Sequence, residues 1–493
     1  MRPASPRSSI SARWLPTLLA GWLALDLLLL WPFLGRTDWV ACAVWPVMAA
    51  LLVFSTWRAS RMMEDRIDLR TLLICAAVAF TLLVLGGEGR LFYANLDWRV
   101  REAVLHDMAV HPWPFAYTAR GLPEVLRAPI GMYLLPALAM KAGGQAAGDW
   151  ALLAQNTVLL TIVLALGATL FPDGRRRAVA LAVFVAFSGL DIVGRWLAGP
   201  IPGHLESWAG TLQYSSHVTQ LFWVPQHALA GWIGAVGFAL WREKRLPPGV
   251  LWALTPLTVL WSPLAALGAL PFTMLAGAVT IIERRLRPTD LLMPALACVL
   301  AVPALLYLSA DTASVGAAAP PLPANIYIAF VALEVLPLLL IASWSARQRA
   351  WGLATIGLIA AILLLPLGQI GRGSDFVMRV SITPLALLAL AVADAVIEAR
   401  GDRRIMALGV LGAGAVTGLH EIRRALTYPA VPPPLCSFYH AWGPGPASER
   451  STYLAAVARL PRPLRPAEIT LVPDRDPRQC WAGPWPVPSG LQY

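Results

Sequence analysis

The stretch Leu15–Leu34 reads LPTLLAGWLALDLLLLWPFL, and its only ionisable side chain is Asp26. A helix of about 20 apolar residues crosses the ~30 Å hydrocarbon core of a bilayer. Arginines precede this stretch, as at Arg13, and no small-residue cleavage site follows before Trp39. We therefore interpret Leu15–Leu34 as a first membrane-spanning helix that is retained in the protein.

Similar apolar stretches recur along most of the 493 residues, of which 57% are hydrophobic and 14% charged. A soluble domain is about 45–50% apolar and about 25% charged. The composition excludes a soluble, disordered or disulfide-rich secreted protein, and it predicts an all-α polytopic membrane protein with about 13 transmembrane helices. The predicted spans are Leu15–Leu34, Trp39–Trp57, Thr71–Gly87, Ala151–Phe171, Ala178–Gly194, Leu221–Trp241, Val250–Ser262, Ala265–Ile282, Leu291–Leu308, Ile326–Trp344, Trp351–Gly368, Val380–Ile397 and Ile405–Leu419.

The net charge of +11 is explained by where the basic residues lie, so it does not call for a nucleic-acid partner. With a cytoplasmic N-terminus, short inside loops hold most of the arginines, for example at Arg58, Arg175 and Arg347. The short outside loops hold only Arg36, Arg195, Arg372 and Arg379. This bias follows the positive-inside rule, and positive inner loops also suit anionic lipid headgroups.

An odd number of spans places the C-terminal tail outside, in the periplasm or extracellular space of a bacterial inner (cytoplasmic) membrane. We divide the chain into an N-terminal helix pair (residues 1–70), a membrane domain (71–420) with a long external loop at 88–150, and an external proline-rich tail (421–493). In this tail we expect a short strand near Ile469–Val472 and a helix near Tyr453–Leu460. Cys436 and Cys480 share the tail, and the sequence leaves open whether they form a disulfide.

The first segment whose side chains could catalyse a reaction or bind a ligand follows Tyr93 and contains Asp97. Apolar residues recur every fourth position, which predicts a helix with one apolar face. Tryptophans at both ends favour a helix lying in the outer membrane–water interface. The opposite reading is that Asp97 only caps this helix and the other polar side chains are solvated. The candidate site residues of this segment are Asp97, Arg99, His106 and Asp107.

The second segment runs from His204 to Trp232 and is rich in tryptophan, amide and imidazole side chains. Aromatic faces and hydrogen-bonding groups together are what a sugar-binding surface needs. The alternative is an aromatic belt at the membrane interface with polar contacts between helices. The candidate binding residues are Glu206, His217, Gln226 and His227.

The third segment is the outside turn Gly368–Thr383, which combines glycines with Arg372, Asp375 and Arg379. Glycine-rich backbone and guanidinium groups suit an anion such as a phosphate. The alternative is a glycine turn with a surface ion pair. No Cys/His spacing resembles a zinc site, and a divalent metal elsewhere is left open.

These segments all fall on the outer side, where the phosphate of a lipid-linked substrate would lie. Here the chain resembles the GT-C superfamily of membrane glycosyltransferases over about Thr71–Leu419. Asp97, in Asn95-Leu-Asp97-Trp-Arg, matches the acidic residue of the first external loop in that superfamily. The stretch Pro129–Pro136 suits the return of this loop to the membrane. The chain lacks the paired Asp-Glu of protein mannosyltransferases and the Trp-Trp-Asp signature of oligosaccharyltransferases.

The resemblance implies inverting transfer of a sugar from a polyprenyl-phosphate donor to a glycan, lipid or protein acceptor outside the cytoplasm. Asp97 would be the general base, with Asp107 or Asp375 as alternates. Arg379 or Arg372 would stabilise the departing phosphate.

Two other classes of function stay open. The acidic residues Asp26 and Glu334 lie near the middle of predicted spans and would suit a transporter or flippase. No internal repeat accompanies them, although transporters commonly have one. A non-catalytic envelope scaffold also fits the sequence.

Overall fold

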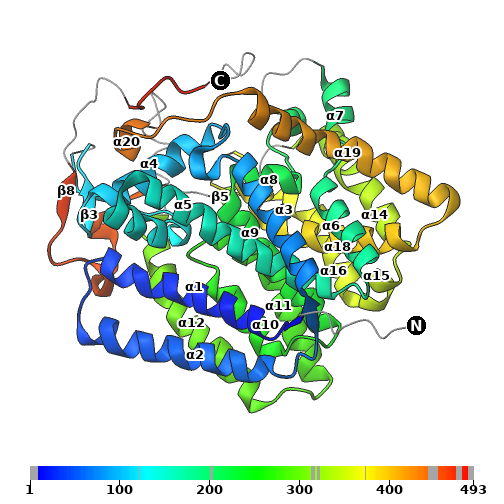
Figure 1. Ribbon diagram of the computed structural model, residues 1–493, viewed down its shortest axis with the longest axis horizontal. Coiled ribbons are helices and arrows are strands. Elements are labelled where there is room, and N and C mark those ends of the chain that lie inside the picture. The colour runs from blue at the N-terminus through cyan, green and yellow to red at the C-terminus, as the bar shows by residue number, and fades with distance from the viewer. Residues whose placement is uncertain are drawn as a thin grey trace.

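The computed structural model describes residues 9–119, 121–199, 204–312, 317–318, 322–371, 373–441, 453–472 and 480–486. The structure is mostly helical (71%), compatible with the expected all-α membrane protein. Figure 1 shows the helices that make up most of the molecule, with β3 and β8 at one end.

Eight helical stretches in the described residues are long and apolar enough to cross a membrane. They are Trp14–Phe33 (α1), Val40–Ser60 (a π-helical turn and α2, Trp45–Ser60), Gly131–Thr169 (α5), Gly174–Ala198 (α6, Gly174–Ala186, and α7, Asp191–Ala198), Pro263–Ile282 (α11), Pro288–Leu308 (α12), Ala324–Ala342 (α13, Ala324–Phe330, and α14, Leu336–Ala342) and Gly401–Thr427 (α19). Shorter apolar helices are α3 (Leu69–Leu85), α10 (Pro248–Leu257) and α16 (Leu353–Leu364).

The expected count of about 13 spans is not confirmed, because several predicted spans are short or broken helices. The span expected at Leu221–Trp241 divides into α8 (His217–Trp223) and α9 (Pro225–Arg242). Pro225 lacks an N–H and disfavours helical geometry at Val224, which has φ −140° and ψ 54°. The other helices are α4 (Asp97–Val110), α15 (Ala346–Trp351), α17 (Asp375–Val380), α18 (Ile382–Glu398) and α20 (Phe438–Ala441).

Helix α5 is longer than predicted and shortens the external loop that was expected at residues 88–150. It begins at Gly131, and only Gly144, with φ +78°, interrupts its helical geometry. The start of α5 packs closely on Trp261, because a Cβ on Gly131 would lie 2.4 Å from the Trp261 ring.

A small sheet joins the first external segment to the C-terminal tail, and it adds strands to a fold expected to be all-α. The strands are β3 (Phe115–Tyr117), β4 (Glu124–Leu126), β7 (Leu454–Ala456) and β8 (Thr470–Val472), in the order β7-β4-β3-β8. The strand expected near Ile469–Val472 is confirmed as β8. Of the helix expected near Tyr453–Leu460 only a 3₁₀ turn forms, at Val457–Arg459, because Leu454–Ala456 pairs with β4. Two further pairs are β1 (Ser9–Ser11) with β2 (Arg66–Asp68) and β5 (Ala317–Ala318) with β6 (Gln369–Ile370).

The tail is held to the first external segment by more than the sheet. A disulfide links Cys436 to Cys480. Arg90 donates to the backbone carbonyl of Pro432 at 3.1 Å, and the tail helix α20 packs on α4. Figure 1 shows β3, β8 and α20 together at one end of the molecule.

The loops predicted to lie inside are joined at the opposite end, near α15 in Figure 1. Arg177 pairs with Asp68 at 2.8 Å, and Arg347 pairs with Glu243. The contacts therefore sort the loops into the two sets that the arginine pattern separated. The structure shows no membrane, so the choice of inner and outer side stays a prediction.

Helix α4 forms where a helix was expected, but most of its residues are buried against other parts of the protein. Trp98, Leu105 and Met108 are buried, and the helix packs on α5 and α20. Glu102 is also buried and pairs with Arg90. A helix with so many buried charged and aromatic side chains is held by protein on several sides.

We expect Asp107 to make docking of the tail depend on pH. Its Oδ2 accepts hydrogen bonds from the Tyr117 hydroxyl at 2.6 Å and from the Phe438 N–H at 2.7 Å. Burial raises the pKa of Asp107 to about 7, although these two bonds act in the opposite direction. A carboxyl whose pKa is higher in the folded than in the unfolded state stabilises the fold at low pH, and this stability is lost as pH rises through the folded pKa.

Limited proteolysis of the tail at pH 5 and pH 8 measures this effect. The ratio of the wild-type cleavage rate to that of Asp107→Asn should be higher at pH 8 than at pH 5. The variant keeps an oxygen acceptor but does not ionise, so it also controls for the protease. The same pH response in both proteins would contradict this role of Asp107.

Candidate functional site

The candidate site begins at the broken junction between α8 and α9. The last carbonyls of a helix have no partner within it. Here the carbonyl of Phe222 accepts from the Asn95 side chain and the Trp98 indole, each at 2.8 Å. The carbonyl of Trp223 accepts from Nε of Arg101 at 2.9 Å. The first turn of α4 is thereby attached to the end of α8.

This attachment positions Asp97. Its backbone N–H donates to the side-chain oxygen of Asn95 at 3.1 Å, and its Oδ2 lies 3.4 Å from Nη2 of Arg101. The side chain of Asp97 is 44% exposed, whereas that of Arg101 is 7% exposed. Nη1 of Arg101 also approaches the Tyr133 hydroxyl at 3.4 Å. The Asp97 carboxylate is therefore accessible, and its neighbours are fixed.

The short helix α17, just before α18, contributes a second ion pair beside Asp97. Arg379 and Asp375 lie one turn apart on α17, and their charged atoms are 2.7 Å apart. The surrounding protein partly desolvates the Asp97 carboxyl and so raises its pKa, and the charge of Asp375 adds to this, while Arg101 and Arg379 act in the opposite direction. The net shift is upward. Asp97 thus lies within electrostatic reach of residues almost 280 positions away in the chain.

The start of α9 provides imidazole and amide groups nearby. Nδ1 of His227 lies 2.8 Å from the Ser262 hydroxyl, and Nε2 lies 3.4 Å from the Gln226 amide nitrogen. The charges of Arg379 and Arg101 both act on His227. Residues from α4, α5, α9, α17 and the tail therefore gather at one place. We call this set the Asp97 cluster, and its members are Asp97, Arg101, Tyr133, His227, Asp375, Arg379 and Tyr453.

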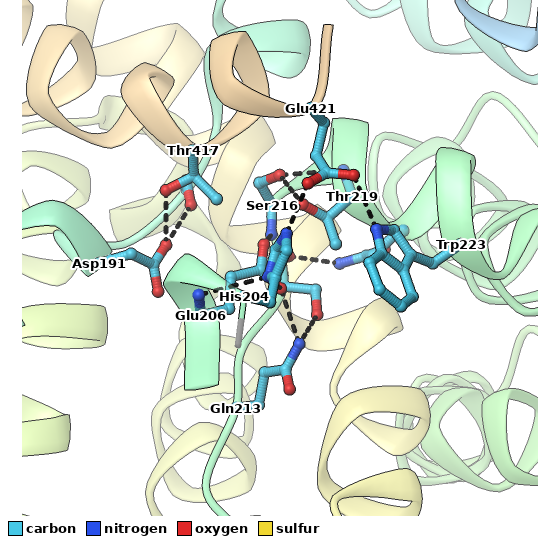
Figure 2. A network of polar contacts seen from close by, with 12 residues as sticks. Asp191, His204, Glu206, Gln213, Ser216, Thr219, Trp223, Thr417 and Glu421 are labelled. Atoms are coloured by element: carbon cyan, nitrogen blue, oxygen red, sulfur yellow. Dashed lines mark hydrogen bonds and ion pairs between the residues drawn. The ribbon is translucent and has the colours of Figure 1, made fainter. Parts of the chain in front are cut away.

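A second polar set includes Trp223 of α8 and is drawn in Figure 2. Glu421 of α19 is its centre: it accepts from the Trp223 indole at 2.8 Å and from Arg424 at 2.9 Å, and it lies 2.7 Å from Nε2 of His204. We call this set the His204–Glu421 network. It comprises Asp191, His204, Glu206, Gln213, Ser216, Thr219, Trp223, Thr417, Glu421 and Arg424.

The carboxylate of Glu206 is fully engaged in this network. One oxygen accepts from the Gln213 amide at 2.7 Å and the other from the Ser216 N–H at 2.9 Å. Burial raises the pKa of Glu206 to about 7, although His204 acts in the opposite direction. Burial lowers the pKa of His204, but the charge and hydrogen bond of Glu421 and the charge of Glu206 together outweigh it, so the net shift is upward. Satisfied, buried groups of this kind suit a positioning role.

Trp223 connects the two sets, because its carbonyl accepts from Arg101 and its indole donates to Glu421. Arg424 adds a further connection, since its guanidinium lies 5.7 Å from the Tyr93 ring centre, just before α4. The network therefore fixes the helix end on which the Asp97 cluster is built.

The predicted site residues divide between the Asp97 cluster, the His204–Glu421 network and other parts of the structure. Asp97, Asp375, Arg379, His227 and its neighbour Gln226 come together in or beside the Asp97 cluster. Glu206 belongs to the network instead.

Four other candidates lie apart from the cluster. Asp107 anchors the tail. His217 is packed among Phe184, Phe187 and Trp232. Arg99 lies over the ring of Trp485 in the tail at 5.3 Å. His106 is half-buried on α4, and Arg372 lies outside the described residues.

Several members of the two sets escaped the sequence reasoning. The sequence could have indicated Arg101, because it follows Asp97 by one helical turn. The sequence could not have indicated Tyr453 and Glu421, because long stretches of chain separate them from their partners. Among the described residues, no three His, Cys, Asp or Glu side chains are grouped to hold a metal ion.

The Asp97 cluster has a definite chemical capacity. An accessible carboxylate with a raised pKa can accept a proton. Two guanidinium groups beside it can bind an anion or stabilise charge that develops on one. Comparison of the chain with protein-family models, curated proteins and solved structures gave no match.

We expect Glu421→Gln to destabilise the protein strongly. The change removes the negative charge that His204 and Arg424 share in a buried site. Removing one partner of a buried ion pair costs about 3–5 kcal/mol. Thermal unfolding of the purified protein in detergent measures the effect. Glu398→Gln, at an exposed position, is the matched control. Equal unfolding temperatures for the two variants would refute the central role of Glu421.

Proposed function

We propose that the protein is a GT-C-type glycosyltransferase that moves a sugar from a polyprenyl-phosphate donor to an acceptor on the outer side of the cytoplasmic membrane. One observation carries this proposal: an accessible carboxylate, Asp97, shares a site with Arg101, one helical turn away, and with Arg379, which comes from a distant part of the chain. A sugar transfer to a hydroxyl group needs a base beside the acceptor and positive charge beside the leaving phosphate.

Asp97 is the proposed base. It takes the proton of the acceptor hydroxyl as the hydroxyl oxygen attacks the anomeric carbon. The bond between that carbon and the lipid-phosphate oxygen breaks, and the phosphate leaves with the bonding electrons. One displacement inverts the anomeric carbon. The raised pKa of Asp97 supports this role, because a stronger base accepts the proton more readily.

Arg379 and Arg101 are the proposed phosphate ligands. Nε of Arg379 is buried and has no hydrogen-bond partner among the described residues, so it keeps a donor for a ligand. Its pairing with Asp375 balances its charge. Guanidinium groups bind phosphate oxygens through paired N–H donors. Asp375 therefore fits a positioning role better than that of the base.

Sugar recognition is assigned to the start of α9 and to the tail. Gln226 and His227 offer amide and imidazole groups beside the cluster. The charges of Asp97 and Arg379 act on Tyr453 of the tail, which lies beside them. The tail would thus cover the site from the outer side. The acceptor, whether a glycan, a lipid or a protein, is left open, and no metal or other cofactor is assigned.

The alternative function is a transporter or flippase, favoured by the buried acids Asp26 and Glu334. One oxygen of Asp26 has no hydrogen-bond partner among the described residues, whereas the carboxyl of Glu334 contacts that of Asp191. The other oxygen of Asp26 and one oxygen of Glu334 accept from the indoles of Trp261 and Trp208, at 2.7 and 2.9 Å. These tight pairings inside the packed helices support a structural role more than a substrate path.

We expect Asp97→Asn to lower sugar transfer by a factor of about 10²–10⁴, the usual range for loss of a general base. The measurement is incorporation of labelled sugar from a panel of polyprenyl-phosphate donors by the reconstituted protein. Asp402→Asn, at an exposed position on α19, is the matched control and should retain the wild-type rate. Wild-type incorporation by Asp97→Asn would eliminate this residue as the base.

A further inference from the structure

A cavity of about 470 Å³ lies between α3, α5, α6, α9 and α18, away from the Asp97 cluster. Ligand-binding cavities span about 300–1,000 Å³, so this volume is large enough for a ligand. Helix α6 packs on α18 and helix α3 packs on α5, which leaves α3 and α6 as opposite walls. These helices are labelled in Figure 1.

The body of the cavity is apolar. Each of the five helices contributes aliphatic or small side chains, such as Val163 of α5, Leu181 of α6 and Leu390 of α18. The rings of Phe184 and Trp232 also line it, with their centres 4.8 Å apart. Ile74 of α3 lines it too and is 44% exposed at the outer surface of the helices. This wall therefore reaches the surface that would face lipid.

The rim of the cavity is basic. Arg70, Arg175 and Arg177 line it where α3 and α6 begin. Arg177 is already engaged with Asp68, which also caps α3. Arg70 and Arg175 are exposed and form no ion pair within the described ranges of the chain. Two guanidinium groups are thus available at the edge of an apolar space.

We propose that this cavity binds an acyl chain of an anionic phospholipid from the inner leaflet, with the lipid phosphate on Arg70 and Arg175. An apolar cavity takes the chain, and a basic rim favours an anionic headgroup over a neutral one. The rim belongs to the same end of the molecule as the other arginine-rich loops, where inner-leaflet headgroups would lie. This site is independent of the proposed sugar transfer.

The experiment is native mass spectrometry of the delipidated protein with added phosphatidylglycerol or phosphatidylcholine of identical chains. The wild type should retain phosphatidylglycerol at least tenfold better than phosphatidylcholine. Arg70→Gln combined with Arg175→Gln should remove this preference, because each basic residue near an anionic headgroup contributes to binding. Arg284→Gln combined with Arg404→Gln, at exposed positions elsewhere, is the matched control and should keep it.

A second variant tests the place of the chain. Ala168→Trp puts a large ring on a residue that lines the cavity and should abolish retention of both lipids. The rim variants change only exposed side chains, so they keep the test valid if Ala168→Trp does not fold. Equal retention of the two lipids by the wild type, an unchanged preference in the rim variant, or undiminished retention in folded Ala168→Trp would each overturn the proposal.

Discussion

The arrangement of the tail-covered end depends on one interruption of a helix. Pro225 ends α8 and leaves the carbonyls of Phe222 and Trp223 without helical partners. Side chains of α4 satisfy both carbonyls and so hold Asp97 beside the start of α9. An uninterrupted helix would bond these carbonyls internally, and α4 would lose its attachment. The two carbonyls that lack partners within α8 thereby bind side chains of α4, and this fixes the position of the accessible Asp97 carboxylate.

The His204–Glu421 network secures the same helix end from the other side. Buried charges are stable only when they are paired and hydrogen-bonded. Glu421 meets this condition through His204, Arg424 and the Trp223 indole. The tail, held by the disulfide and by Asp107, brings Tyr453 to the site. The described residues thus show a site assembled from five parts of the chain, each fixed by its own contacts.

Much of this architecture could be predicted from the sequence, since it follows from local patterns. Apolar length identified the helices, and arginine placement separated the two sets of loops that the contacts join. The same reasoning failed where contacts between distant parts of the chain determine the position of an element or a residue. Helix α4 was expected on a membrane surface, but it is buried because α5 and the tail cover it. The pairing of β7 with β4 positions Tyr453, and no local sequence pattern predicts this pairing.

The central claim is that Asp97, Arg101 and Arg379 form one site for a lipid-linked phosphate at the tail-covered end. An experimental structure of the protein in a nanodisc with a bound polyprenyl-phosphate sugar tests this claim most directly. The account predicts the phosphate within hydrogen-bond distance of Arg379 or Arg101, with the sugar beside Asp97. A phosphate bound at the arginine-rich loops of the opposite end would contradict it.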